Sequence, residues 1–324
     1  MKHINIFLLL ILLISYAHGA RDYLKTSEGN GYPKKLLAYI ENYRAETEAD
    51  PYILANSDRN DITAGDNSKI FDFIANQDND AYIKYYGKTI NYNEFISSGI
   101  KALLVGETHN FDLEKEVVKI VENFKKHRHM PYFASEFMAS DANDLIALCQ
   151  SSGDKNILNG KQVRKEVKPF IEEFSELKII GLEPPEIFNA PFPFVCDYSR
   201  AVLYYRAKAD DDVRLAVLSP EAVAYRNRHW VKMLTPYLSD NNIIVVYGGA
   251  GHMFYGDPSG SIADRLMGQN INTAVMFLLS KKQFKTKGGE YKNLEKKFSK
   301  GKAVVKIPDS EKKIFPFDYL VITD

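Results

Sequence analysis

The 324-residue chain has few of the residues from which disulfide frameworks and zinc knuckles are built. It contains two cysteines, Cys149 and Cys196, which lack the spacing of a zinc knuckle or of a Cys-x-x-Cys redox site. In an oxidising compartment the two could form one disulfide, and two unpaired thiols are the alternative. The formal net charge is zero. A neutral chain argues against nucleic acid as the main partner, because nucleic-acid-binding proteins usually carry a basic face.

Several catalytic motifs are also absent. The chain has no Gly-x-x-x-x-Gly-Lys-Ser/Thr phosphate loop, no Gly-x-Ser-x-Gly nucleophile elbow and no His-Glu-x-x-His zinc motif. The string Gly249-Ala250-Gly251 begins like a dinucleotide fingerprint, but Phe254 occupies the place of its third glycine. These absences favour a metal or acid/base site formed at the ends of strands.

Long apolar runs are missing after the first residues. Lys2, an apolar run over residues 4–14 and the small-residue site Ala17-His18-Gly19 predict a signal peptide over residues 1–19. That run is shorter than the roughly 20 residues a membrane span needs. We therefore expect a secreted or periplasmic protein with no stable membrane anchor after cleavage, since no cysteine near the cleavage site offers a lipidation point.

The remaining chain alternates between strand and helix patterns. We expect a helical and loop extension over residues 20–79, with one helix at 33–49, a short helix or strand at 70–74, and an α/β domain over residues 80–281. The expected strands are 102–106, 132–135, 177–182, 243–247 and 273–279, and the expected helices are 92–97, 112–126, 140–150, 165–176, 197–237 and 260–268. This alternation predicts a mostly parallel sheet with helices on both faces. Residues 282–324 are expected to form a solvated loop, over 282–301, and two edge strands of the same domain, over 303–307 and 319–323.

Two short strings share the pattern of a glycine followed three residues later by a histidine. They are Gly106-Glu107-Thr108-His109 and Gly249-Ala250-Gly251-His252, and each directly follows an apolar, strand-like run. The carboxyl ends of strands in an open α/β sheet are where ligands bind. A neutral imidazole is both a metal ligand and a general base near neutral pH. A structural, hydrogen-bonding histidine is the alternative at each position.

Carboxylates and one helix complete the candidate site. Glu107, Glu136 and Glu183 stand at the ends of three expected strands. Two histidines with one or more carboxylates form a familiar hydrolytic metal set, although a charged residue after a buried strand can simply mark where solvent begins. The helical stretch 225–233 places Arg226 and Asn227 as anion or oxyanion partners, or is a surface helix with Trp230 turned inward.

In their order along the chain, these strings resemble the superfamily that unites Tiki and TraB proteins, ChaN-like haem-binding proteins and erythromycin-esterase-like enzymes. The resemblance covers about residues 80–280. It rests on the two Gly-x-x-His strings, Glu136, Gly181-Leu182-Glu183 and Arg226-Asn227. Residues 82–109 look most like the ChaN-type members. The resemblance implies an α/β fold with a pocket formed by these residues.

The branches of that superfamily imply different chemistry. The Tiki branch implies a Mn- or Co-dependent metallopeptidase in which His109, Glu136 and His252 are the metal ligands. The esterase branch implies a histidine that acts as a general base on water, and the ChaN branch implies haem binding without catalysis. Four tyrosines are the candidate axial ligands for haem: Tyr204, Tyr205, Tyr247 and Tyr255.

We therefore predict an exported hydrolase, assisted by a divalent metal (Mn, Co or Zn), that cleaves an ester or amide bond in a small-molecule or peptide substrate. The alternatives are a haem- or iron-compound-binding protein and an interaction protein that keeps an inactive pocket. The sequence predicts no oligomeric state. The predicted catalytic residues are Glu107, His109, Glu136, Arg226 and His252, and the predicted cofactor-binding residues are Glu183, Asn227 and Tyr247.

Overall fold

The computed structural model describes residues 67–108, 112–127, 130, 132–154, 158, 163–188, 220–238, 242–257, 260–285 and 291–324. The chain forms two compact units, Met1–Asp50 with Pro191–Tyr225 and Pro51–Ala190 with Arg226–Asp324. Apart from residues 220–225, every described residue belongs to the second unit. The predicted signal peptide, the predicted helix at 33–49 and Cys196 lie outside the described residues.

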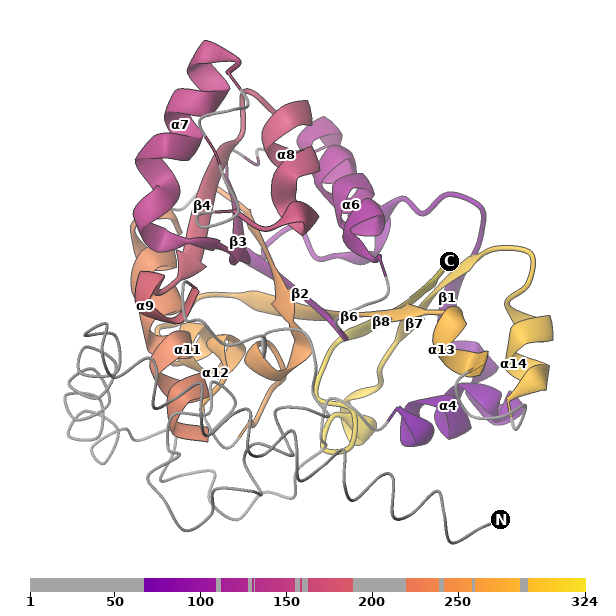
Figure 1. The fold of residues 1–324 in the computed structure, drawn as a ribbon. Helices are drawn as coiled ribbons and strands as arrows, with labels where there is room; N and C mark the ends of the chain where they lie inside the picture. The colour runs from indigo at the N-terminus through magenta and orange to yellow at the C-terminus, as the bar shows by residue number, and fades with distance from the viewer. Residues whose placement is uncertain are drawn as a thin grey trace, which may run out of the picture. The chain divides into compact units, whose positions relative to one another are not determined.

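The second unit is built on an eight-stranded sheet of order β1-β7-β8-β6-β2-β5-β3-β4 (Figure 1). The strands are β1 (Ile83–Gly87), β2 (Ala102–Glu107), β3 (Tyr132–Ala139), β4 (Lys178–Glu183), β5 (Ile244–Gly249), β6 (Thr273–Ser280), β7 (Lys302–Lys306) and β8 (Tyr319–Thr323). The six strands from β8 to β4 pair in parallel, whereas β7 is antiparallel to both β8 and β1. The predicted α/β fold with a mostly parallel sheet is confirmed.

Two helical layers cover the sheet. The helices are α4 (Ser68–Ala75), α5 (Tyr92–Phe95), α6 (Glu114–His127), α7 (Asn143–Ser152), α8 (Lys168–Glu173), α9 (Pro185–Phe188), α11 (Pro220–Leu234), α12 (Ile262–Gly268), α13 (Lys282–Lys285) and α14 (Lys292–Lys297). The 3₁₀ turns are η2 (Gln77–Tyr82), η3 (Ser140–Ala142), η5 (Lys165–Val167), η7 (Thr235–Tyr237), η8 (Ala250–His252) and η9 (Asp309–Glu311).

Alternation along each strand divides the core into two clusters, one for each face of the sheet. Leu103 and Val105 of β2 point to the face covered by α6, α7 and α8, whereas Ala102 and Leu104 point to the face covered by α4, α11, α12, α13 and α14. Both helical layers are visible in Figure 1, with α6 to α8 on one side of the sheet and α11 and α12 on the other. Burial on both faces explains why the central strands are almost wholly apolar.

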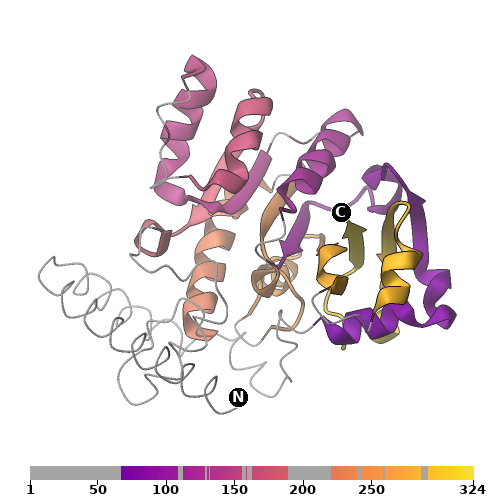
Figure 2. The same ribbon diagram turned by 45° about the vertical axis from the view of Figure 1, so that its right-hand side comes forward.

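The C-terminal part differs from the prediction. The described residues of the loop predicted over 282–301 are helical in part, since they contain α13 and α14. Phe284 of α13, Leu294 of α14 and Phe298, which follows α14, are buried. β7 and β8 pair as predicted, but they do not form the edge, since β1 covers β7. In Figure 2, α14 lies beside α4, in agreement with the contacts between these two helices. Among the described helices, none is long and apolar enough to cross a membrane.

Candidate active site

Four of the predicted site residues lie at the carboxyl ends of the parallel strands. Glu107 and Glu183 are the last residues of β2 and β4, and His252 closes η8, the turn that follows β5. Glu136 lies inside β3 and not after it, because β3 runs on for three more residues. All four are between 3% and 6% exposed. His109, predicted at the same edge, lies outside the described residues.

Asn227 of α11 fixes the orientation of the His252 ring. The Asn227 amide nitrogen donates to the Gly260 carbonyl at 2.9 Å, so its oxygen Oδ1 is the acceptor that faces His252. His252 Nδ1 lies 2.6 Å from this oxygen. Nδ1 therefore carries a proton, and in the neutral ring the lone pair lies on Nε2. A histidine oriented in this way by a third group is the arrangement that general-base catalysis requires.

Trp230, the one tryptophan of the chain, packs on His252. The two ring centroids are 4.4 Å apart and the planes are tilted by 33°. Trp230 is fully buried, and its indole Nε1 has no hydrogen-bond partner within the described structure. The guanidinium of Arg226 lies 5.5 Å from the indole ring centre. A buried donor that lacks a partner costs about 1–3 kcal/mol, so an acceptor oxygen that reached this N–H would be stabilised.

Arg226 and Glu183 form a buried ion pair. Arg226 donates from Nε and Nη2 to the two carboxylate oxygens of Glu183, at 2.7 and 2.8 Å. Burial raises the pKa of Glu183 to about 7, although Arg226 acts in the opposite direction, and the charge of Glu136 raises it further. Because two nitrogens of Arg226 are directed at Glu183, the structure gives Arg226 a positioning contact, and its oxyanion role stays a prediction.

Glu136 is held by the backbone of β5. Its Oε2 accepts the Gly249 N–H at 2.7 Å. A Cβ on the preceding residue, Gly248, would lie 2.7 Å from the same oxygen. Glycine at position 248 therefore makes the space that this carboxylate fills, on the face of the sheet that carries α11 and α12.

Glu107 lies on the opposite face. The Tyr247 hydroxyl donates to Glu107 Oε2 at 2.7 Å, and Tyr247 packs in the core cluster under α6 to α8, with its ring centre 5.1 Å from that of Phe137. Burial, followed by the charge of Glu107, raises the pKa of Tyr247 well above its usual value. The sheet thus separates Glu107 and Tyr247 from the group of His252, Asn227 and Trp230.

The two glycine motifs meet physically. A Cβ on Gly106 would lie 2.9 Å from the Ala250 Cα and 3.3 Å from its Cβ, so the end of β2 and the turn η8 approach each other more closely than an alanine at 106 would allow. The first motif therefore helps to position the turn that carries His252. This contact is backbone packing and does not depend on His109.

The described residues do not supply a complete metal-binding set. No group of three or more His, Cys, Asp or Glu side chains lies close enough to hold a metal ion in the part of the chain that the structure describes. Of the three predicted ligands, Glu136 and His252 are placed and His109 is not.

Two further residues of α11, Trp230 and His229, lie near residues of interest. Trp230 was interpreted from its pattern as a core residue, and the structure places it against His252. Its position four residues after Arg226 and three after Asn227, on one face of α11, is the signal that could have identified it. His229 of the same helix has its Nε2 3.0 Å from Ser140 Oγ, a hydrogen-bonding contact away from His252.

No protein-family model matches the chain, and no curated protein matches its sequence. Solved structures do match. They include a bacterial protein toxin at 14% identity and TM-score 0.42, over 70% of this chain and 44% of that one. Two others are RRSP, a MARTX toxin effector domain of Vibrio vulnificus (18% identity, TM-score 0.35, over 56% and 33%), and ChaN of Campylobacter jejuni, which binds haem cofacially (14%, 0.41, over 74% and 97%).

The chain spans 33% to 44% of the length of the toxin chains that it matches. At TM-scores of 0.35 to 0.42 these likenesses assign neither a family nor an activity. ChaN and the toxin domains are structural neighbours of the chain. The resemblance to Tiki, TraB and erythromycin-esterase-like proteins stays a prediction from the sequence.

Proposed function

We propose that the protein is a hydrolase that cleaves an ester or amide bond, with His252 as the general base. The observation that carries the proposal is the buried hydrogen bond from His252 Nδ1 to Asn227 Oδ1, with Asn227 itself oriented by the Gly260 carbonyl. A base held by a third group through one nitrogen, with the lone pair on the other, is the arrangement used in nucleophilic and general-base hydrolysis.

In this mechanism Nε2 of His252 takes a proton from water while the water oxygen attacks the acyl carbon. Asn227 accepts the Nδ1 hydrogen bond throughout, so the ring keeps its orientation as it becomes cationic. When the bond to the leaving group breaks, the imidazolium returns the proton from Nε2 to the leaving oxygen or nitrogen. The Trp230 N–H, which has no hydrogen-bond partner among the described residues, would supply a donor for a substrate oxygen.

The carboxylates complete the site in supporting roles. Arg226 neutralises Glu183 in the buried pair, and the pKa of about 7 lets Glu183 exchange a proton near neutral pH. Glu136 places a second carboxylate near that pair, since its charge raises the pKa of Glu183. The proposal includes a divalent metal only if His109, Glu136 and His252 together bind one.

The test is hydrolysis by the purified protein of a chromogenic acyl-ester panel and a peptide library, with added Mn²⁺ and with a chelator. We expect His252→Gln to lower kcat/KM by at least about 100-fold, the usual contribution of a general base. Asn227→Ala should lower kcat/KM strongly. Asn227→Asp should retain more activity, because a carboxylate oxygen still accepts the hydrogen bond from Nδ1–H of His252. The matched control is His229→Gln, which removes a histidine of α11, the helix of Asn227, that bonds to Ser140.

Unchanged hydrolysis in His252→Gln would refute the proposal. A Soret band after haem addition, with no hydrolysis of either panel, would favour the haem-binding alternative. In the structure the hydroxyls of two candidate haem ligands are already engaged, Tyr247 with Glu107 and Tyr255 with Asp318, and the other two tyrosines lie outside the described residues. We further propose that the protein acts outside the cytoplasm, which N-terminal sequencing of the exported form would test.

A further inference from the structure

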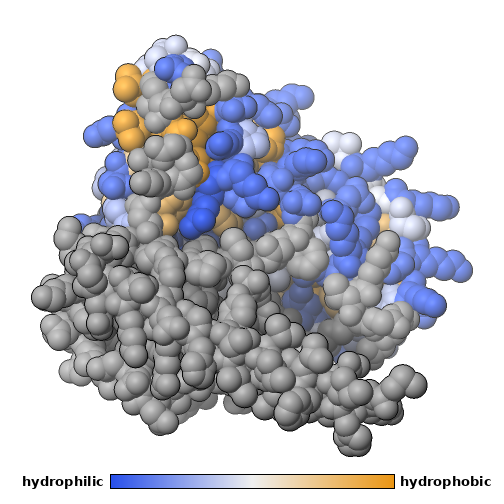
Figure 3. All heavy atoms as spheres, in the orientation of Figure 1, coloured by the Kyte–Doolittle hydropathy of each residue, from blue (hydrophilic) through white to orange (hydrophobic). Residues whose placement is uncertain are grey.

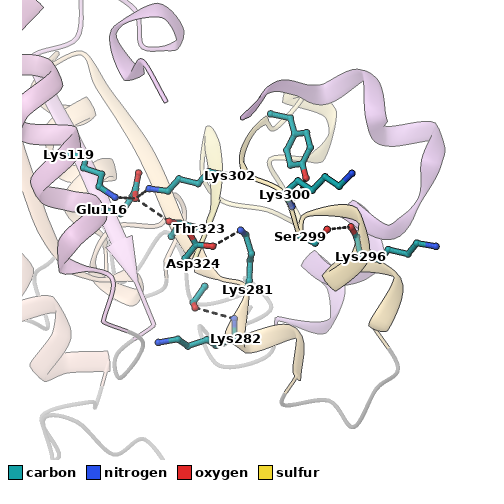
Figure 4. A network of polar contacts seen from close by, with 12 residues as sticks. Glu116, Lys119, Lys281, Lys282, Lys296, Ser299, Lys300, Lys302, Thr323 and Asp324 are labelled. Carbon is teal, nitrogen blue, oxygen red and sulfur yellow. Dashed lines mark hydrogen bonds and ion pairs between the residues drawn. The ribbon is translucent and has the colours of Figure 1, made fainter. Parts of the chain in front are cut away.

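The C-terminal segment of the sheet carries an unusual excess of lysine. Residues 281–306 contain ten lysines, two glutamates and no arginine or aspartate, a formal charge of +8 in a chain whose formal net charge is zero. This segment comprises α13, α14 and β7. Lys292 and Lys296, four residues apart on α14, are both exposed, and so is Lys300 in the turn that follows. In Figure 4 the side chains of Lys296 and Lys300 extend to the same side, away from the body of the protein.

The edge strand β1 adds to this surface through a direct contact. Lys84 and Tyr86 are the exposed residues of β1. The Tyr86 ring packs edge-on against Phe298, with centroids 6.2 Å apart, and its hydroxyl accepts the Lys300 backbone N–H at 3.1 Å. Tyr86 is nevertheless 46% exposed. It therefore stands as an aromatic ring among the surrounding lysines.

A close approach of two glycines brings one more lysine to the same place. A Cβ on Gly301 would lie 2.7 Å from the Gly87 carbonyl oxygen, so the chains at the ends of β1 and β7 nearly touch. Lys88 follows Gly87 and Lys300 precedes Gly301, which places these two lysines together. We call the surface formed by Lys84, Lys88, Lys292, Lys296 and Lys300 around Tyr86 the lysine face.

The charges of the lysine face are not compensated within the described structure. None of its five lysines has a carboxylate within ion-pair distance there, whereas four neighbouring lysines of the segment do, among them Lys282, which lies 3.8 Å from Asp112. Lys281 pairs with Asp324, Lys297 with Asp80 and Lys302 with Glu116. Figure 3 shows hydrophilic residues over the region of α13 and α14, while hydrophobic surface gathers near α7. The lysine face is therefore a patch of like charge that an anionic partner would neutralise.

We propose that the lysine face binds the surface of a bilayer rich in acidic phospholipids. Lysine without arginine suits a diffuse field of anionic headgroups, whereas paired recognition of nucleic-acid phosphates and bases favours arginine. The exposed Tyr86 fits the same surface, since amphipathic aromatic rings lie at headgroup level. Binding at this face would keep the protein peripheral to the membrane.

The experiment is co-sedimentation of the full chain with vesicles of phosphatidylcholine alone and of phosphatidylcholine with phosphatidylglycerol. We expect binding to the acidic vesicles at low salt, loss of binding at high salt, and none to the neutral vesicles. Each lysine near an acidic bilayer contributes about fivefold in affinity, so the triple variant Lys292→Gln, Lys296→Gln and Lys300→Gln should bind about 100-fold more weakly.

The matched control changes three exposed lysines elsewhere, Lys126→Gln, Lys165→Gln and Lys168→Gln, for the same loss of charge. It should bind within about twofold of wild type. Equal weakening by both triples would show that only net charge matters and would overturn the assignment to this face. Absence of binding to acidic vesicles would overturn the lipid proposal itself. So would a competition in which duplex DNA displaces the protein from the vesicles at a lower concentration than soluble phosphatidylglycerol does.

Discussion

Replacement of Gly106 by alanine should damage the turn that carries His252. The added Cβ would lie 2.9 Å from the Ala250 Cα, against about 3.5–4.0 Å for an ordinary carbon–carbon contact, so backbone must move by about half an ångström or more. Overpacking of this kind costs about 1–3 kcal/mol of unfolding free energy. Since Ala250 begins the turn that ends at His252, the shift should also reach the His252–Trp230 contact.

The assay is urea unfolding followed by far-ultraviolet circular dichroism, together with the emission of Trp230, the chain's one tryptophan. The matched control is Gly251→Ala in the same turn, where no described residue beyond its two chain neighbours has an atom within 4 Å of the new Cβ. We expect Gly106→Ala to lose stability and to shift the emission, and Gly251→Ala to be neutral or to gain up to about 1 kcal/mol. Equal stability and emission in the two variants would refute the reasoning.

Three further outcomes are expected. Burial raises the folded-state pKa of Glu183 from 4.5 to about 7, so the folded protein holds the proton more tightly than the unfolded chain does. Relative to Glu183→Gln, wild type should therefore lose about 3 kcal/mol of unfolding free energy as pH rises from about 4.5 to 7. Parallel pH profiles of the two proteins would contradict this. Trp230→Phe removes a donor that has no partner in the part of the chain that the structure describes, so thermal unfolding should show a loss under about 1 kcal/mol, against about 3–5 for Trp230→Ala. Glu116→Gln leaves the Lys302 ammonium buried without its carboxylate and should cost about 3–5 kcal/mol in urea unfolding, whereas the exposed Glu122→Gln on the same helix should cost under about 0.5.

The central sheet could be predicted because its strands are buried on both faces. Residues 102–106 and 243–247 are continuous apolar runs, and such runs alternating with amphipathic helices have few other solutions. β1 could not be predicted in this way. Its residues alternate between half-buried and exposed at an edge, and its five-residue sequence contains two tyrosines, a lysine and a glycine, which give a weak pattern.

The loop predicted over 282–301 was wrong for a related reason. α13 and α14 are four and six residues long, too short to establish a helical period, and lysines fill half of their positions. Their stability comes from the burial of Phe284, Leu294 and Phe298 against the sheet layer below, which is tertiary packing that no local pattern records.

For the candidate site, the sequence predicted which residues lie near the strand ends, but it could not predict which face of the sheet each side chain occupies. Glu107 and Glu136 occupy similar strand-end positions in the sequence, yet a register one residue apart sends the first toward Tyr247 and the second toward Gly249. The Asn227–His252 bond likewise joins residues 25 positions apart, which requires the packing of α11 on the sheet.

The repeated glycine–histidine motif therefore has two separable functions. Its histidine in the second copy is oriented by Asn227, while its glycines act through the backbone: Gly106 admits the turn at Ala250, and Gly249 donates its N–H to Glu136. The contact at Gly106 requires close approach, so glycine would be needed there even in a protein that had lost catalysis. At position 249 any residue with a backbone N–H could donate to Glu136. The glycine of the first motif thus belongs to this packing of strand and turn, and the proposed hydrolysis depends on the orientation of His252.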